Sequence, residues 1–322
     1  MTKRFCHLIF VFILLMNLHV EYTIHLFNIH LKIMKELNFI FKLILIVMVH
    51  ACDTKKQEVN ALGFPDLESP FFAQKPPDSI PEIFAPRIVS TAQNDSAAAF
   101  SPNIKEIYFR RFDEGLNDSA LVAIQYKDNL WTETFVVPRG EISPDGTILY
   151  KGNEYRERTP SGWSELKPIG APFDSIPIMR LTASSERTYY FDDVSQFNDK
   201  SLVPIRYSRL IDGKHEKPQT LNFDMGTTLQ FHPFIAPDES YLIFDSRPEG
   251  GDNDIYISFR NNDGSWGNAI NLGDTINTEF SDVYGSVTPD GKYFFFRSTL
   301  SNGKNNTMWV DTSFIEKLRP KP

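Results

Sequence analysis

The stretch VTPDGKYFFF, residues 287–296, joins a tight turn to a strand that needs burial on both faces. Pro289 fixes φ at the first corner of the turn, Asp290 can bond back to its own backbone, and Gly291 tolerates the left-handed conformation that reverses the chain. The aromatic run that follows is continuous rather than alternating, as in strands covered on both sides. The phrase therefore predicts one corner of a β-sheet that packs between other sheets.

The same phrase occurs five times along the chain. The copies are AFSPNIKEIYFRR (99–111), EISPDGTILYKG (141–152), LTASSERTYYFDD (181–193), FIAPDESYLIFDS (234–246) and SVTPDGKYFFFRS (286–298). The spacings are 42, 40, 53 and 52 residues when the anchor residues are Pro102, Pro144, Ser184, Pro237 and Pro289. Periods of this size are typical of propeller blades and other repeat arrays. The copy at Ser184 departs furthest from the others, so its turn is the least well defined by the pattern.

A second feature follows each of the first four copies. It is a hairpin turn that places an aromatic residue or a histidine 29, 19, 31 or 29 residues after the anchor, at Trp131, Trp163, His215 and Trp266. Each unit therefore supplies four antiparallel strands. Strands buried on both faces favour sheets packed around an axis over a two-sheet sandwich. We predict an all-β fold, a single β-propeller in which five blades can be counted from the repeat. Six blades are possible if one blade has lost the motif.

The two ends of the repeat region complement each other. The last unit stops after its third strand, at residues 307–311, and residues 86–91 read as a fourth strand that lacks its first three. We therefore expect the N-terminal strand to pair with the C-terminal blade and close the ring.

The SPDG phrase and its apolar strand resemble the WD40-like PD40 repeat of TolB-type β-propellers. The match is densest over residues 232–298 and extends over nearly all of 81–319. This resemblance implies a propeller, usually of six blades. It leaves the function open, because the family includes periplasmic scaffolds, sensor domains, lipoproteins and some enzymes.

Residues 1–51 are predicted to be a signal region. Their two apolar runs, at 8–16 and 39–52, each fall short of the ~20 residues that a bilayer core requires. The second run follows Met34 and Lys35 and ends in VHAC, which resembles the lipobox of bacterial lipoproteins. The resemblance implies that Cys52 is lipidated and becomes the mature N-terminus.

Translation is expected to start at Met34, which would make residues 1–33 an overextended gene start; the alternative is a genuine two-segment anchor. Residues 52–81 are predicted to be a Pro-rich tether, although Phe71 and Phe72 could pack on the domain. Residues 82–322 then form the propeller.

Composition excludes several functional classes. Removing residues 1–51 takes away five Lys/Arg and two Asp/Glu, so the 33 and 41 of the whole chain become 28 and 39, and the net charge becomes −11. Such a charge argues against binding to nucleic acid. With Cys52 acylated, no free thiol remains, and the mature chain has only His215 and His232, so we expect no metal centre and no cofactor. The sequence also lacks a GxSxG elbow, a phosphate loop and a dinucleotide fingerprint.

Charged side chains recur eight residues after the anchors, where the second strand of each blade ends. The residues at this position are Arg110, Gly152, Asp192, Asp245 and Arg297, and Arg111 and Arg247 stand close by. We predict that the charged ones form a ligand-binding rim at the mouth of the channel, although solvated charges at strand ends would give the same pattern. Asp192 and Asp245 could instead be the paired carboxylates of a glycosidase or lyase.

The predicted function is that of an exported lipoprotein, held in the bacterial cell envelope by its lipid, with a non-catalytic propeller that binds an envelope protein or a glycan. The alternative is a propeller-fold glycoside hydrolase or polysaccharide lyase that uses the rim carboxylates.

Overall fold

The structure is a computed structural model, and it describes residues 71–321 except 73, 92, 114–117, 129, 200–201, 226–228 and 249–250. The predictions for the start at Met34, the signal region 1–51, lipidation of Cys52 and most of the tether lie outside the described residues. Within these residues, no helix has the length and apolar character needed to cross a bilayer.

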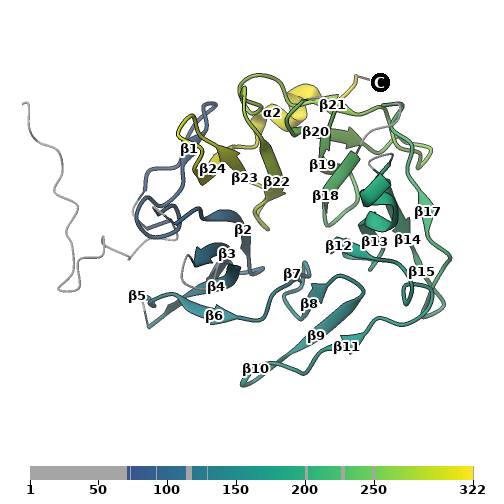
Figure 1. The fold of residues 1–322 in the computed structure, drawn as a ribbon, viewed down its shortest axis with the longest axis horizontal. Coiled ribbons are helices and arrows are strands. Elements are labelled where there is room, and N and C mark those ends of the chain that lie inside the picture. Colours follow the sequence, from purple (N-terminus) through teal and green to yellow (C-terminus); the bar gives the residue numbers. More distant parts are fainter. Residues whose placement is uncertain are drawn as a thin grey trace, which may run out of the picture. The chain divides into compact units, whose positions relative to one another are not determined.

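Five antiparallel blades are arranged around a common axis, and the first strand of each blade lies nearest that axis (Figure 1). Blade 1 contains β2 (Ser96–Phe100), β3 (Glu106–Asp113), β4 (Asp118–Lys127), β5 (Leu130–Trp131) and β6 (Phe135–Val137). Blade 2 contains β7 (Glu141–Ile142), β8 (Ile148–Lys151), β9 (Glu154–Thr159), β10 (Gly162–Trp163) and β11 (Lys167–Pro168). Blade 3 contains β12 (Ile178–Ala183), β13 (Tyr189–Asp193), β14 (Ile205–Ser208), β15 (Leu210–Ile211), β16 (Lys214–His215) and β17 (Gln219–Thr220).

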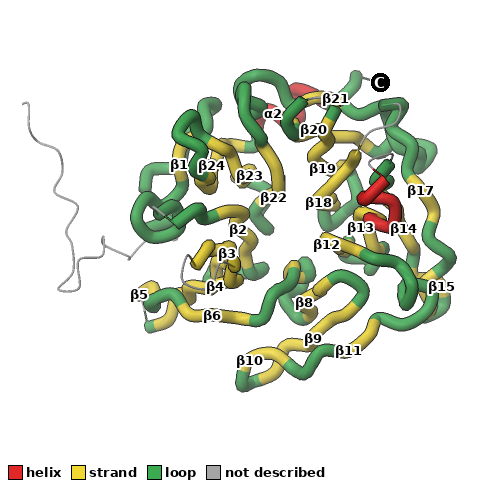
Figure 2. Tube along the Cα trace, in the orientation of Figure 1, coloured by secondary structure: helices red, strands yellow, loops and turns green. Residues whose placement is uncertain are grey.

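Blade 4 contains β18 (Leu229–Ile235), β19 (Tyr241–Arg247), β20 (Asp254–Phe259) and β21 (Ile270–Asn271). Blade 5 contains β22 (Asp282–Val287), β23 (Tyr293–Thr299), β24 (Asn305–Asp311) and β1 (Glu82–Ile83). Helix in the described chain is confined to the short η1 (Val194–Asp199) and α2 (Ser313–Leu318), as Figure 2 shows. The all-β propeller predicted from the repeat is confirmed, with five blades.

Each repeated phrase forms the turn between the first two strands of a blade. Each of the five turns is closed by a backbone hydrogen bond of 2.8–3.0 Å. The residue that donates this bond has a positive φ in every turn; these residues are Ile104, Gly146, Arg187, Glu239 and Gly291. In blade 3 the turn is one residue shorter, because the Ser184 N–H bonds to the Thr188 carbonyl over four residues, whereas the other turns span five. The alignment on Ser184 therefore holds for the second strand, but for the first strand the equivalent of the prolines is Ser185.

The second repeated feature lies where it was predicted, in the hairpin before the outermost strand. Two of its rings pack on their own blades: Trp163 lies under the Arg158 guanidinium at 4.9 Å, and His215 stacks on Tyr189 at 4.0 Å. Trp131 is buried, and Trp266 also contacts Tyr190 of the preceding blade at 6.0 Å.

The ring closes by strand pairing, but through earlier residues than predicted. The closing strand is β1, whose Glu82 and Ile83 pair with Trp309 and Met308 of β24, and the Phe84 N–H donates to the Thr307 carbonyl at 2.8 Å. The assignment of residues 86–91 to this strand was wrong. These residues turn instead, with φ of 71° at Arg87, and the turn buries two consecutive apolar side chains, Ile88 and Val89, which an alternating strand would not do.

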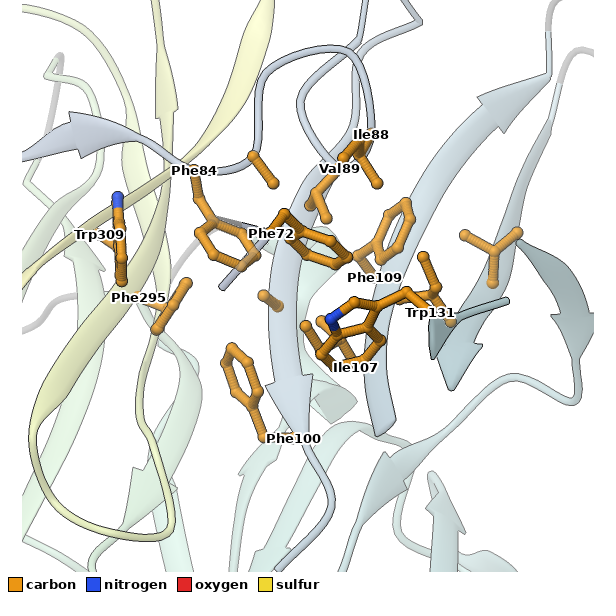
Figure 3. Close-up of a cluster of buried hydrophobic side chains, with 14 residues drawn as sticks. Phe72, Phe84, Ile88, Val89, Phe100, Ile107, Phe109, Trp131, Phe295 and Trp309 are labelled. Atoms are coloured by element: carbon orange, nitrogen blue, oxygen red, sulfur yellow. The ribbon is translucent and has the colours of Figure 1, made fainter. Parts of the chain in front are cut away.

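The closing segment fills the seam between blades 5 and 1 (Figure 3). Phe84 is fully buried, with its ring centroid 4.9 Å from that of Phe295 and 5.2 Å from that of Trp309. Phe72 is 1% exposed and contacts Trp131 at 4.8 Å. The C-terminal end of the predicted tether therefore packs on the propeller through Phe71 and Phe72, which was the alternative considered for these two residues.

Candidate functional site

Irregular first strands bring side chains together near the axis. The pairing of first and second strands shifts register between Ile178 and Leu181, between Phe231 and Phe234, and between Val283 and Ser286, which are the sites of β-bulges. Within these bulges His232 and Tyr284 have φ of 50° and 60°. Non-glycine residues in the left-handed region are strained, and such strain is concentrated at functional sites.

Two carboxylates hold the bulges in place. Asp192, on β13, is fully buried and accepts the backbone N–H groups of Met179 (2.9 Å), Arg180 (2.8 Å) and His232 (3.0 Å). Since the last of these lies on β18, Asp192 ties blade 3 to blade 4. Burial raises the pKa of Asp192, while the charge of His232 and the three N–H donors oppose this rise.

Asp245, on β19, ties blade 4 to blade 5 in a similar way. It is 1% exposed, accepts the Tyr284 N–H at 3.1 Å and lies 2.9 Å from the His232 Nδ1. The His232 ring also packs against the Tyr284 ring, with 3.7 Å between centroids. A chain of contacts therefore runs from blade 3 through blade 4 to blade 5.

Three arginines surround the Tyr284 ring. The guanidinium carbons of Arg110, Arg180 and Arg297 lie 5.6, 5.7 and 5.3 Å from the ring centroid. Glu141 is paired with two of them, at 3.3 Å from Arg180 and 3.9 Å from Arg110. Burial raises the pKa of the Tyr284 hydroxyl, while the charges of Arg110 and Arg297 act to lower it. We name Arg110, Arg180, Arg297, Glu141 and Tyr284 the arginine cluster.

A cavity of about 470 Å³ lies on the axis, between the arginine cluster and the repeated turns. All five first strands line it, through residues that include Ala99, Ile142, Thr182, Phe234 and Ser286. Glu141 and Arg180 lie at the boundary with the cluster, and Asp145 and Arg187 stand on the turns. A volume of this size is typical of small-molecule pockets.

The predicted rim residues are not one structural set. Asp192 and Asp245 are buried beside the bulges and are not solvated charges at strand ends; the three backbone N–H groups on Asp192 and the His232 ring on Asp245 explain why charged groups lie inside. Arg110 and Arg297 meet at Tyr284, whereas Arg111 bonds to Asp95 at 2.8 Å and Arg247 is exposed at the end of β19. Whether any of these residues binds a ligand stays a prediction.

Sequence reasoning missed Glu141, Arg180, His232 and Tyr284 as members of the site. Three of them share a position in the repeat. When Ser185 is taken as the anchor of blade 3 in place of Ser184, the residues Arg180, His232 and Tyr284 each lie five residues before the anchor of their blade. The spacing was informative, but the shortened turn in blade 3 concealed it.

The carboxylates that line the cavity are not the two that the sequence singled out. Neither Asp192 nor Asp245 lines it. Of its own carboxylates, Glu141 is held by arginines, and hydrogen bonds from Ser143 and Thr147 bring the pKa of Asp145 below its ordinary value, although burial acts to raise it. A glycosidase needs a carboxylic acid with a raised pKa to protonate the leaving group. Asp145, which lines this cavity, does not have that property.

No family model matches the chain, and no curated protein does. Similar solved structures include TolB from Acinetobacter baumannii, with 15% identity over 70% of this chain and 56% of that one and a TM-score of 0.43. They also include an endo-arabinase from Bacteroides thetaiotaomicron VPI-5482, with 15% identity over 71% of this chain and 97% of that one and a TM-score of 0.43. A thermostable family-43 glycoside hydrolase has 12% identity over 73% of this chain and 90% of that one, with a TM-score of 0.39.

This chain therefore spans little more than half of that TolB protein. TolB proteins are among the similar structures, as the resemblance of the repeat implied. The propeller fold itself rests on the five blades described above, and these likenesses say nothing of the ligand.

Proposed function

We propose that this protein is an exported lipoprotein, anchored by Cys52, whose propeller binds the end of a glycan without cleaving it. The observation that carries the proposal is the axial cavity of about 470 Å³ to which all five blades contribute. Its apolar wall residues, such as Ile142 and Phe234, alternate with hydroxyl side chains, such as Thr182 and Ser185. Sugar rings present the same mixture of apolar faces and hydroxyl groups.

One hydroxyl of the cavity wall lacks a hydrogen-bond partner within the described part of the chain. The Thr182 Oγ1 is buried and has no hydrogen-bond partner among the described residues. An unsatisfied buried hydroxyl is unfavourable by about 1–3 kcal/mol, so a ligand that bonds to it gains affinity. Thr182 itself is partly exposed to the cavity, so a rotation of its side chain would bring the hydroxyl to a ligand. Thr182→Val removes the hydroxyl at nearly constant volume, and we expect it to weaken binding.

Binding is tested with the detergent-solubilised full chain on an array of envelope glycans and peptides. Ser185 is exposed at the cavity mouth, so Ser185→Trp should fill the entrance and abolish binding. Ser161→Trp is the matched control, because Ser161 is exposed in the turn between β9 and β10 and does not line the cavity. Equal binding by both variants would place the ligand elsewhere, and retention of peptides alone would replace the glycan with a protein partner.

Two further measurements test the rest of the proposal. Cleavage of any bound glycan by the purified protein would overturn the non-catalytic part of the proposal. Cys52→Ala should release the protein from the membrane fraction; an unchanged fraction would refute the lipid anchor.

A further inference from the structure

The arginine cluster has three guanidinium groups but only one carboxylate at bonding distance among the described residues. Three guanidiniums surround Tyr284, and Glu141 is the one carboxylate that the described residues bring within 4.0 Å of any of them. Arg297 takes part in no ion pair within the described part of the chain, and its buried Nε has no hydrogen-bond partner there. Arg180, which is 5% exposed, also has an unpartnered Nε.

The other acids near Arg297, Asp245 and Asp282, lie more than 4.0 Å from its guanidinium, and the buried Oδ1 of Asp282 has no hydrogen-bond partner among the described residues. Asp245 accepts the Tyr284 N–H and lies against His232, and Asp282 accepts the Thr278 N–H at 2.7 Å. Burial lowers the pKa of Arg297, with smaller opposing effects from Tyr284, Asp245 and Asp282. A buried cation without a partner at bonding distance is unfavourable, and proteins keep such groups where a ligand supplies the missing charge.

We propose that Arg110, Arg180 and Arg297 form a site for a small oxyanion, a phosphate or sulfate group, at the Tyr284 end of the channel. Guanidinium groups suit such anions, because their planar N–H fork can bond two oxygens at once. In the unliganded protein the Glu141 carboxylate pairs with Arg110 and Arg180, where the anion would bind. Binding therefore displaces Glu141 from its two arginines.

The site is separate from the glycan cavity but shares a wall with it. Glu141 and Arg180 line both the large cavity and a second one of about 20 Å³, against which Arg110 also lies. The second cavity holds about one water-sized group, so a larger anion needs the space that Glu141 leaves. The Arg110 side chain is 33% exposed, which gives the anion a route from solvent.

The test is titration of the full chain with inorganic phosphate or with sulfate, at constant ionic strength, followed by calorimetry. We expect saturable binding of one anion per chain. Arg297→Gln should weaken binding at least tenfold, since charge-assisted hydrogen bonds contribute about 1.5–3 kcal/mol each. Glu141→Gln should strengthen binding, because it removes the competing carboxylate. This opposite sign distinguishes a binding role from general damage to the fold.

Arg209→Gln is the control, because Arg209 is an exposed arginine that pairs with Glu216 at 2.6 Å away from the cluster. If Arg297→Gln does not fold, Arg110→Gln at the more exposed position decides the question. Linear, non-saturable heats, or equal affinities in the Arg297, Arg110 and Arg209 variants, would overturn the proposal. A preference for phosphate or for sulfate identifies the anion, and acetate binding as tightly as either would mean that the site takes carboxylates instead. Ser185→Trp should leave anion binding intact, so failure of the glycan proposal and failure of this one can be told apart.

Discussion

Asp192→Asn should destabilise the propeller at the junction of blades 3 and 4. The asparagine carbonyl can keep the bonds to the Met179 and Arg180 N–H groups, but its NH₂ then faces the His232 N–H, which loses its acceptor. One unsatisfied N–H costs about 1–3 kcal/mol, and each of the two remaining bonds weakens by about 1 kcal/mol without the negative charge. Removal of a buried charge offsets some of this loss. We expect the free energy of unfolding to fall by about 2–4 kcal/mol.

The assay is urea unfolding of the wild type, Asp192→Asn and the control Asp252→Asn, in which the same change is made at an exposed position. The control should change the free energy of unfolding by less than about 0.5 kcal/mol. Hydrogen exchange provides a local readout: the His232 amide should exchange faster in Asp192→Asn, and the amides of Met179 and Arg180 should change less. A loss below about 0.5 kcal/mol, or exchange that is unchanged at His232, would refute the view that Asp192 joins the two blades.

Three other perturbations test the structure. Phe84→Ala should lower the free energy of unfolding by about 3–5 kcal/mol, because the fully buried ring leaves a cavity at the closing seam; a loss under about 1 kcal/mol in urea unfolding would show that the seam is loosely packed. Gly285→Ala should destabilise by about 1–3 kcal/mol, since the added Cβ would lie 2.8 Å from the Ile243 Cγ2, and a thermal midpoint equal to that of the wild type would contradict this contact. Asp193 has a pKa below its ordinary value, because hydrogen bonds from Ser195 and Arg206 outweigh burial, so it stabilises the fold above the unfolded pKa of about 4 and loses this contribution as the pH falls through the folded value. The stability difference between wild type and Asp193→Asn should therefore shrink below about pH 4, and a difference independent of pH would exclude the effect.

The blades could be predicted from sequence because each turn depends on local chemistry. Pro289, Asp290 and Gly291 are consecutive, so the turn can be predicted from three neighbouring residues. The continuous apolar run that follows predicts a strand buried on both faces. The closing strand was placed four residues too late, at Pro86 instead of Glu82, because its partner lies more than 200 residues away and a two-residue strand has almost no pattern of its own.

The site was harder to predict, since a bulge has no residue signature. His232 and Tyr284 adopt left-handed backbone, which is uncommon for residues other than glycine, and the tertiary hydrogen bonds of their N–H groups to Asp192 and Asp245 stabilise this conformation. The same two aspartates could be identified as unusual from their spacing, but not as buried, because the donors they accept belong to neighbouring blades.

Closure by β1 also sets the order of events in folding. Blade 5 lacks its outermost strand until Glu82 and Ile83 meet residues 308 and 309, so the first described strand must wait for the last one to be synthesised. During that interval Phe72, Phe84 and Trp131 have no cover from Phe295 and Trp309. Contacts between such distant segments form slowly, and exposed apolar surface makes the incomplete chain prone to aggregation. We therefore expect the nascent chain to aggregate most readily at this open aromatic seam, before the ring is complete.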